Sequence, residues 1–287
     1  MTHSSKPSVY RVHPPESEPA PAVFDSPHSG TTYPDDFGHD CHIDHLRGAE
    51  DMYVDELFSA APRHGAVYLC AEFPRSYIDT NRTLHDIDHE LLEDEWPHPS
   101  TPSEKTAIGK GLVWRNLLHG HPIYDRLLSV AELKARIDRY YRPYHSVLDS
   151  LVEQTIKRHG FVYHINCHSM PPVVYPVDRP EGVTAEDFVL GDRDGASCEP
   201  EFTAIVAEAL RATGASVAIN EPFKGVELVR RHGRPHEDRH SLQIEINRRL
   251  YLNDDYSRSD GFDDVKATMD SVIAVICRYA KDRASSD

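Results

Sequence analysis

The chain has 287 residues, of which 39% are hydrophobic and 27% are charged, which is enough to bury one large core and predicts a single α/β domain. Aspartate and glutamate total 47 against 31 lysines and arginines, and the formal net charge of −16 argues against nucleic acid as a partner because it would repel a phosphate backbone. No segment approaches the roughly 18 uninterrupted apolar residues of a membrane helix, and the amino-terminal stretch lacks the apolar core of a signal peptide, so we expect a cytoplasmic protein with no membrane partner.

Residues 1–21 are polar and contain several prolines, and they are expected to form a flexible arm ahead of one domain over residues 22–287. Along that domain, short runs of β-branched and aromatic residues alternate with longer segments whose apolar residues have helical spacing. The expected strands cover residues 22–25, 66–71, 161–167, 188–190, 216–220 and 241–247, and the expected helices cover residues 51–64, 130–159, 199–213 and 262–281. This order predicts an α/β fold in which helices flank a sheet.

Capping and breaking residues mark the ends of these helices. Ser129 and Glu132 form a capping box before residues 130–159, and glycines at positions 65, 160 and 214 stand where helices should stop. Pro143 is expected to kink or divide the long middle helix. Residues 84–111 are acidic, contain three prolines and are too long for a plain connector. They could form a mobile lid over a site or a solvated loop, and their polar composition favours the loop.

Residues 234–247, RPHEDRHSLQIEIN, contain the zinc-protease pattern H-E-x-x-H. That pattern needs a helix, because only a helical turn lets two histidines four residues apart reach one metal ion. Residues 242–247 alternate with period two and include two isoleucines, which predicts a strand directly after the pattern. We therefore interpret His236 to His240 as a polar loop.

Cysteine chemistry is not indicated. The five cysteines are odd in number, scattered and without a C-x-x-C pair, so they suggest neither a disulfide framework nor a cysteine zinc site. The 19 histidines instead direct attention to metal ligation.

Sites in sheet-based α/β folds gather where strands end. His28 follows the first expected strand, between a proline and a glycine that allow the backbone to approach a ligand, although a lone histidine in a turn is usually just solvated. His168 follows the strand 161–167, and period two places His164, Asn166 and His168 on one face. A metal with its supporting groups would give these polar side chains partners, and hydrogen bonds at a wet sheet edge are the alternative.

Glu245 lies in the last expected strand between two isoleucines, and a carboxylate in such surroundings suits a general acid or base. A salt bridge to Arg248 or Arg249 is the alternative. Asp51 begins a predicted helix, where an acidic residue is most simply an N-cap.

Asn81 and Arg82 stand side by side and could hold a small carboxylate. Arginines are common at protein surfaces, so this pair alone is weak evidence.

Six segments occur in an order and spacing that resembles the N-formylglutamate amidohydrolase family. They are DSPHSG, EDMYVDEL, DTNR, NCHSMP, LGDRDGASC and GRPHEDRHSLQIEIN, and the resemblance covers about residues 22 to 255. The family is similar to zinc carboxypeptidases and to the aspartoacylase and succinylglutamate desuccinylase group. The resemblance therefore implies a zinc-exopeptidase-like (phosphorylase/hydrolase-like) α/β fold, with a mixed, largely parallel sheet flanked by helices on both faces, and one catalytic domain over residues 22–287.

The resemblance also implies a metal site. His28, His168 and Asp51 would bind one Zn²⁺ ion, and a water would fill the open position that catalytic zinc keeps. Asp51 would then be a ligand, and could also cap a helix whose N-terminus faces the metal. The same ligand set also suits iron, cobalt or manganese.

In this family pattern Glu245 would be the general base that takes a proton from the metal-bound water and returns it to the leaving amine. Arg75 is a candidate second oxyanion donor, with a structural ion pair as the alternative. The amide of Asn166 would orient His168, although the family often has an acidic residue at this position.

Asn81 and Arg82 would bind a substrate carboxylate and orient the amide carbon. Gly225 and Arg230 belong to the loop PFKGVELVRRHGRP, which would line the substrate pocket or form a solvated hairpin. The expected ligand is a small, acidic N-acyl amino acid.

The resemblance implies a metal-dependent amidohydrolase that splits N-formyl-L-glutamate into formate and L-glutamate in histidine degradation. A related enzyme acting on another N-formyl or N-acyl amino acid is the first alternative. A noncatalytic protein that keeps the fold and holds a metal or an acidic metabolite is the second.

Overall fold

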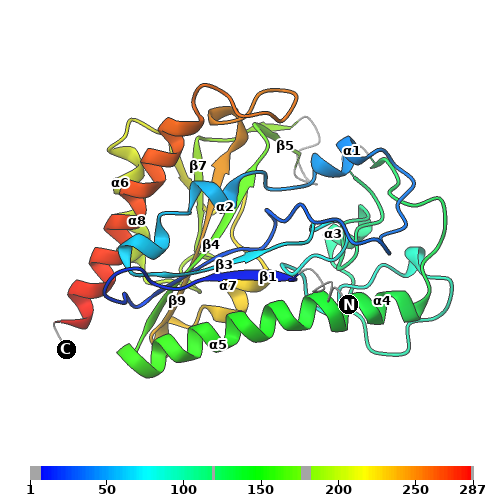
Figure 1. Ribbon diagram of the computed structural model, residues 1–287, viewed down its shortest axis with the longest axis horizontal. Helices are drawn as coiled ribbons and strands as arrows, with labels where there is room; N and C mark the ends of the chain where they lie inside the picture. Colours follow the sequence, from blue (N-terminus) through cyan, green and yellow to red (C-terminus); the bar gives the residue numbers. More distant parts are fainter. Residues whose placement is uncertain (1–7, 118–119, 176–181, 286–287) are drawn as a thin grey trace, which may run out of the picture. The chain divides into compact units, whose positions relative to one another are not determined.

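The computed structural model describes residues 8–117, 120–175 and 182–285 (Figure 1). Its strands are β1 (Tyr10–His13), β2 (Ala22–Ser26), β3 (Val67–Ala71), β4 (Val162–Met170), β5 (Val173–Val174), β6 (Val183–Thr184), β7 (Phe188–Gly191), β8 (Val217–Ile219) and β9 (Arg239–Asn247). Its α-helices are α1 (Ile43–Arg47), α2 (Val54–Leu57), α3 (Glu104–Ala107), α4 (Val130–Arg136), α5 (Arg142–His159), α6 (Pro200–Arg211), α7 (Glu227–His232) and α8 (Phe262–Ala284). Short 3-10 helices cover Ala61–His64, His89–Leu91, Pro235–Glu237 and Arg248–Leu250.

Seven of these strands form one sheet in the order β1-β3-β2-β4-β9-β7-β8. The pairs β2–β4, β4–β9 and β7–β8 are parallel, whereas β7 and β9 are antiparallel. The predicted mixed, largely parallel sheet is therefore confirmed. Every residue of β4 is buried, including the polar residues His164, Asn166 and His168.

Helices cover both faces of the sheet, as predicted. Tyr163 of β4 stacks on Phe202 of α6, with ring centroids 4.2 Å apart, and also touches Tyr279 of α8. The next residue, His164, points the opposite way and packs edge-on against His232 of α7 at 5.0 Å. Thus α6 and α8 lie on one face of β4, and α7 lies on the other.

The predicted helix over residues 51–64 was wrong. The chain forms only α2 and a 3-10 turn at Ala61–His64, because Pro62 lacks an N–H and its ring blocks a continuous α-helix. The N-cap of α2 is Tyr53, with a φ of 60°, so Asp51 is not a helix cap. Strand β1 was not predicted, and it lies within residues 1–21, where the sequence suggested only an arm.

Other local predictions were confirmed. The capping box of Ser129 and Glu132 is present at the start of α4. Between α4 and α5 the helix widens into a π-helical segment, Ile137–Tyr141, and Pro143 follows as the second residue of α5. This widening accommodates the proline ring, so Pro143 does divide the long helix. Residues His236–His240 form a 3-10 turn and the start of β9, which excludes the helix that H-E-x-x-H would need.

The chain comprises two compact units. One contains residues 1–12, 28–50 and 70–147, and the other contains residues 13–27, 51–69 and 148–287. The second unit holds most of the large sheet together with α6, α7 and α8. Across the described ranges, none of the helices combines the length and the apolar character that a bilayer crossing requires.

Candidate metal centre

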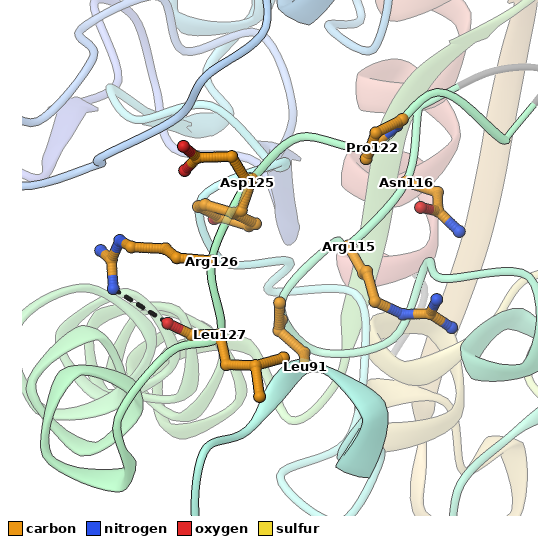
Figure 2. A pocket seen from close by; sticks show the side chains of 8 residues that line it. Leu91, Arg115, Asn116, Pro122, Asp125, Arg126 and Leu127 are labelled. Carbon is orange, nitrogen blue, oxygen red and sulfur yellow. Dashed lines mark hydrogen bonds between the residues drawn. The ribbon is translucent and has the colours of Figure 1, made fainter.

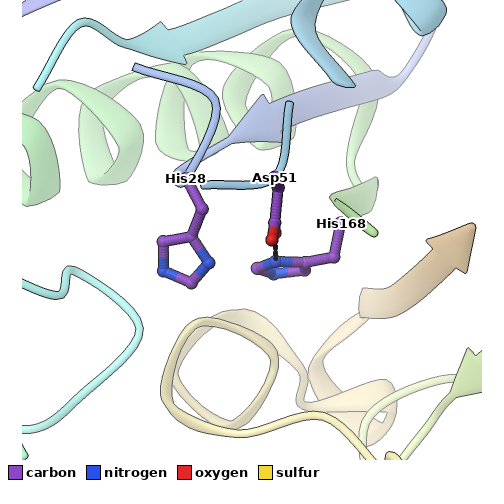
Figure 3. Close-up of side chains that lie close together, drawn as sticks. All are labelled: His28, Asp51 and His168. Carbon is purple, nitrogen blue, oxygen red and sulfur yellow. Dashed lines mark hydrogen bonds and ion pairs between the residues drawn. The ribbon is translucent and has the colours of Figure 1, made fainter. Parts of the chain in front are cut away.

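His28, Asp51 and His168 each offer one ligand atom, and these atoms all lie within 4.8 Å of one another. All three residues are buried, with exposed fractions of 0%, 1% and 2%. Figure 3 shows the two imidazole rings and the carboxylate directed toward a common region. His28 follows the end of β2, and His168 lies near the carboxyl end of β4, so the structure brings together the three predicted ligands.

Hydrogen bonds determine which nitrogen of His168 carries its proton. Asn166 donates its Nδ2–H to Oδ1 of Asp25 at 2.8 Å, because a carboxylate can only accept. Oδ1 of Asn166 is therefore the acceptor that faces Nε2 of His168 at 2.7 Å, and Nε2 carries the proton.

The other ring nitrogen of His168, Nδ1, consequently presents a lone pair. It lies 2.9 Å from Oδ2 of Asp51, which is also a lone-pair atom. Two such atoms repel each other at this distance unless a proton or a metal ion bridges them. Two imidazoles and one carboxylate are a common donor set for catalytic zinc, so the residues fit a metal ion and this group can hold one.

A buried polar network continues behind Asn166. Oδ1 of Asp25 also binds Nε2 of His164 at 2.9 Å, and Nδ1 of His164 binds Oγ of Ser241 at 2.7 Å. Asp25, His164, Asn166 and Ser241 have no exposed surface. The predicted shared face of His164, Asn166 and His168 is confirmed by these bonds, but Asp25 and Ser241 were missed. The sequence feature that points to Asp25 is a carboxylate within the otherwise apolar run of β2.

Asp79 supports His28 and was also missed. Its Oδ1 lies 2.7 Å from Nε2 of His28, and the fully buried carboxylate also accepts from Trp114 Nε1 at 3.2 Å and from Arg75 Nη2 at 3.0 Å. Burial alone would raise the pKa of Asp79, but Arg75, His28 and Arg82 together hold it well below its usual range. The ionised carboxylate keeps the proton of His28 on Nε2 and leaves Nδ1 as the ligand atom.

Gly30 has a packing role in the structure. A side chain there would put its Cβ 2.4 Å from the carbonyl carbon of Glu72 and 2.5 Å from the backbone of Phe73. The glycine therefore allows two backbone segments to pass each other closely.

Glu245 lies beside His168 in the sheet. The two residues are partners in the parallel register of β4 and β9, so their side chains project from the same face. Glu245 is 8% exposed and accepts a hydrogen bond from Gln243 Nε2 at 3.0 Å. Arg248 pairs with Asp51 at 3.0 Å and Arg249 pairs with Asp187 at 2.8 Å.

The predicted substrate-binding residues fall into two groups. Asn81 and Arg82 are buried beside Asp79. Arg75 forms an ion pair with Asp79, which is the predicted alternative to its role as an oxyanion donor.

The other two residues, Gly225 and Arg230, lie before and within α7. The Arg230 side chain is 57% exposed and its guanidinium binds both oxygens of Glu227. Within the described ranges, neither residue forms a hydrogen bond or an ion pair with the three candidate ligands.

A separate pocket lies in the unit that contains residues 70–147 (Figure 2). Its lining includes Arg115, which pairs with Asp88, and Arg126, which pairs with Glu132. Figure 2 also shows Arg126 donating to the carbonyl oxygen of Leu127. Because both guanidinium groups already have carboxylate partners, this pocket has no evident anion-binding chemistry.

Known proteins resemble this chain over most of its length. The family model described as N-formylglutamate amidohydrolase matches residues 20–252. The N-formylglutamate deformylase of Pseudomonas putida is 27% identical over 246 residues, covering 82% of this chain and 82% of the relative. The protein of the same name from Pseudomonas aeruginosa is 25% identical and covers 81% of this chain and 83% of the relative.

Solved structures agree with this relationship. The crystal structure of N-formylglutamate amidohydrolase from Ralstonia eutropha JMP134 has a TM-score of 0.90 and 46% identity, covering 96% of this chain and 99% of that chain. The Atu2144 gene product of Agrobacterium tumefaciens shares the fold, with a TM-score of 0.66 at 16% identity over 98% of this chain and 96% of that one. The family match spans most of the chain and includes all three candidate ligands. The chain is therefore an amidohydrolase that belongs to the N-formylglutamate amidohydrolase family.

Proposed function

We propose that this protein hydrolyses N-formyl-L-glutamate to formate and L-glutamate, as one step of histidine degradation. The observation that carries the proposal is the buried group of His28, Asp51 and His168 in a chain that belongs to this family. The names of the relatives in Pseudomonas and Ralstonia support the substrate. We also propose that residues 22–287 act as one catalytic domain, since the family match draws on both compact units. A cytoplasmic location stays a prediction.

In this proposal Nδ1 of His28, Nδ1 of His168 and a carboxylate oxygen of Asp51 hold one divalent ion, and Zn²⁺ is the expected metal. When bound, such an ion supplies Lewis-acid activation of water and of the formyl carbonyl. Asp79 and Asn166 keep the protons of the two imidazoles on Nε2, so that the ligand nitrogens stay available.

Glu245 is the proposed general base. Its carboxylate accepts a proton from the water that attacks the formyl carbon, and it then donates a proton to the amide nitrogen as the C–N bond breaks. The products are formate and the free amine of glutamate. The register of β4 and β9, which puts Glu245 on the same face as His168, supports this role.

Arg75, Asn81 and Arg82 complete the proposed site. Asn81 and Arg82 bind a substrate carboxylate and thereby orient the scissile amide. Arg75 stabilises the negative charge that develops on the formyl oxygen. Gly225 and Arg230 remain candidate pocket residues, and the pairing of Arg230 with Glu227 weakens the case for Arg230.

The direct test is a formate-release assay on purified protein, joined to elemental analysis of its metal. We expect turnover of N-formyl-L-glutamate to exceed that of the N-acetyl and N-succinyl analogues and of formylated amino acids without a side-chain carboxylate. Failure on formylglutamate with turnover of another N-acyl amino acid would replace the proposed substrate and keep the amidohydrolase.

Replacing Asn166 with leucine is expected to weaken zinc binding about 10- to 100-fold, because the group that orients His168 is lost. The affinity can be measured by competition with a chromophoric chelator, without any activity assay. Ser241→Ala is the matched control, since it removes a buried contact of His164 at the far end of the same network. Equal zinc affinity of folded Asn166→Leu and wild-type protein would show that Asn166 does not support the ligand.

A further inference from the structure

Two cations lie over the ring of Trp114. The guanidinium carbon of Arg75 is 4.9 Å from the ring centroid, and Nζ of Lys110 is 5.2 Å from it. The indole N–H of Trp114 donates to Asp79, which also holds the candidate ligand His28. Lys110 is therefore connected to the metal centre through only two intervening side chains.

Two nearby buried carboxylates, Asp79 and Asp86, are already engaged. Asp79 accepts from His28, Arg75 and Trp114. Asp86 accepts from the backbone and the hydroxyl of Ser103 and from the hydroxyl of Thr106. Within residues 8–117, 120–175 and 182–285, neither Lys110 nor its neighbour Lys105 has a carboxylate at ion-pair distance.

Lys110 is held in place by its backbone. Its N–H donates to the carbonyl of Lys105 at 2.8 Å, and its own carbonyl accepts from Nε of Arg82 at 3.0 Å. An antiparallel bridge joins Lys110 to Trp114. The backbone of this partly buried lysine is thus fixed, which lowers the entropy cost of binding an anion there.

The surroundings of Lys110 are strongly cationic. Burial, followed by repulsion from Arg75, Lys105 and Arg82, lowers the pKa of Lys110 to about 8. Partial loss of solvent contact, followed by repulsion from Arg82 and Arg75, lowers the pKa of Lys105. Lys110 still carries its proton for most of the time at pH 7, and a bound anion would relieve the repulsion among these groups.

We infer that Lys110, with Lys105 beside it, forms the subsite for the side-chain carboxylate of a dicarboxylic N-acyl amino acid. This inference rests on the proposed function. The α-carboxylate of such a substrate shares a carbon with the scissile amide, so it must stay near the reacting group. The side-chain carboxylate lies several bonds farther out. Lys110 shares the Trp114 ring with Arg75, and Arg75 pairs with the Asp79 carboxylate that holds His28, so Lys110 is the next cation outward from the ligand His28.

Lys110→Met is the variant that tests this subsite. We expect it to lower kcat/KM for N-formyl-L-glutamate about 10- to 100-fold, the range for losing a hydrogen bond to a charged group. It should leave turnover of N-formyl-L-glutamine nearly unchanged, because that analogue has no side-chain charge. Lys110→Arg should recover most of the preference for the acid. Lys157→Met, an exposed lysine of α5, is the control for the change in net charge.

Binding of glutarate, an unreactive dicarboxylate, separates this inference from the proposed function. Calorimetry should show binding to the wild-type protein that weakens about 10- to 100-fold in Lys110→Met and is retained in Lys157→Met. Such a result would support the subsite even if formylglutamate were not hydrolysed. Efficient hydrolysis of formylglutamate by Lys110→Met, with the acid still preferred over the amide, would overturn the subsite and leave the proposed function standing.

Discussion

Glu245→Gln is expected to lower kcat for formate release about 10²- to 10⁴-fold while the protein keeps its full complement of metal. Glutamine has nearly the same shape as glutamate but cannot accept a proton from the attacking water. The hydrogen bond from Gln243 to Oε1 of Glu245 can be kept by the amide oxygen of the new side chain, so the fold should be preserved. The measurement is kcat by formate release, with metal content determined on the same samples.

Two outcomes would contradict the role of Glu245. Unchanged kcat in Glu245→Gln would remove it as the general base, and loss of metal together with activity would show that it supports the metal centre. Gln243→Glu is not a suitable control, because it would put a second carboxylate beside the first. Glu237→Gln is a better one, because Glu237 is the exposed glutamate of the H-E-x-x-H pattern and should be dispensable.

His168→Ala is expected to reduce bound zinc below detection and to lower formate release by roughly 10⁴-fold or more, because the Lewis acid is lost together with its ligand. His168 is buried between Asp51 and Asn166, and alanine offers no donor atom to either residue or to a metal. Zinc content by elemental analysis and activity after added zinc are the two measurements. Strong chelation of the wild-type protein should reproduce the loss, and added metal should reverse it.

His236→Ala is the matched control for that experiment. The His236 side chain is 78% exposed and lies in a 3-10 turn, although it belongs to the only H-E-x-x-H match in the sequence. We expect it to keep both metal and activity. The opposite result, with metal retained in His168→Ala and lost in His236→Ala, would move the metal centre to residues 236–240 and refute the proposed ligand set.

The local sequence determined much of the fold. β-branched and aromatic residues predicted β2 and β4, and period-two alternation with two isoleucines predicted β9, because these patterns are typical of strands. The strand pattern of residues 242–247 was enough to reject a zinc helix at His236. The predicted helix over residues 51–64 does not form, although its apolar spacing is helical, because Pro62 cannot lie within a continuous helix.

For the site, the sequence determined the candidate groups but not their supports. His28, Asp51 and His168 came from a resemblance between short segments, and their proximity depends on segments up to 140 residues apart, which no local pattern encodes. The partners Asp25, Asp79 and Ser241 were missed because each looks ordinary in its own segment and acquires a role only through a neighbour distant in the chain.

Lys110 illustrates the same difference between sequence and structure. In the sequence it is one lysine in an acidic, proline-containing segment, and that composition favoured a solvated loop. In the folded chain its carbonyl accepts from Arg82, and its ammonium group lies over Trp114 near Arg75. Side-chain chemistry and strand pattern are local properties that the sequence carries by itself. The proton positions on the histidines and the gathering of cations depend on distances between separate segments, and only the tertiary structure decides those.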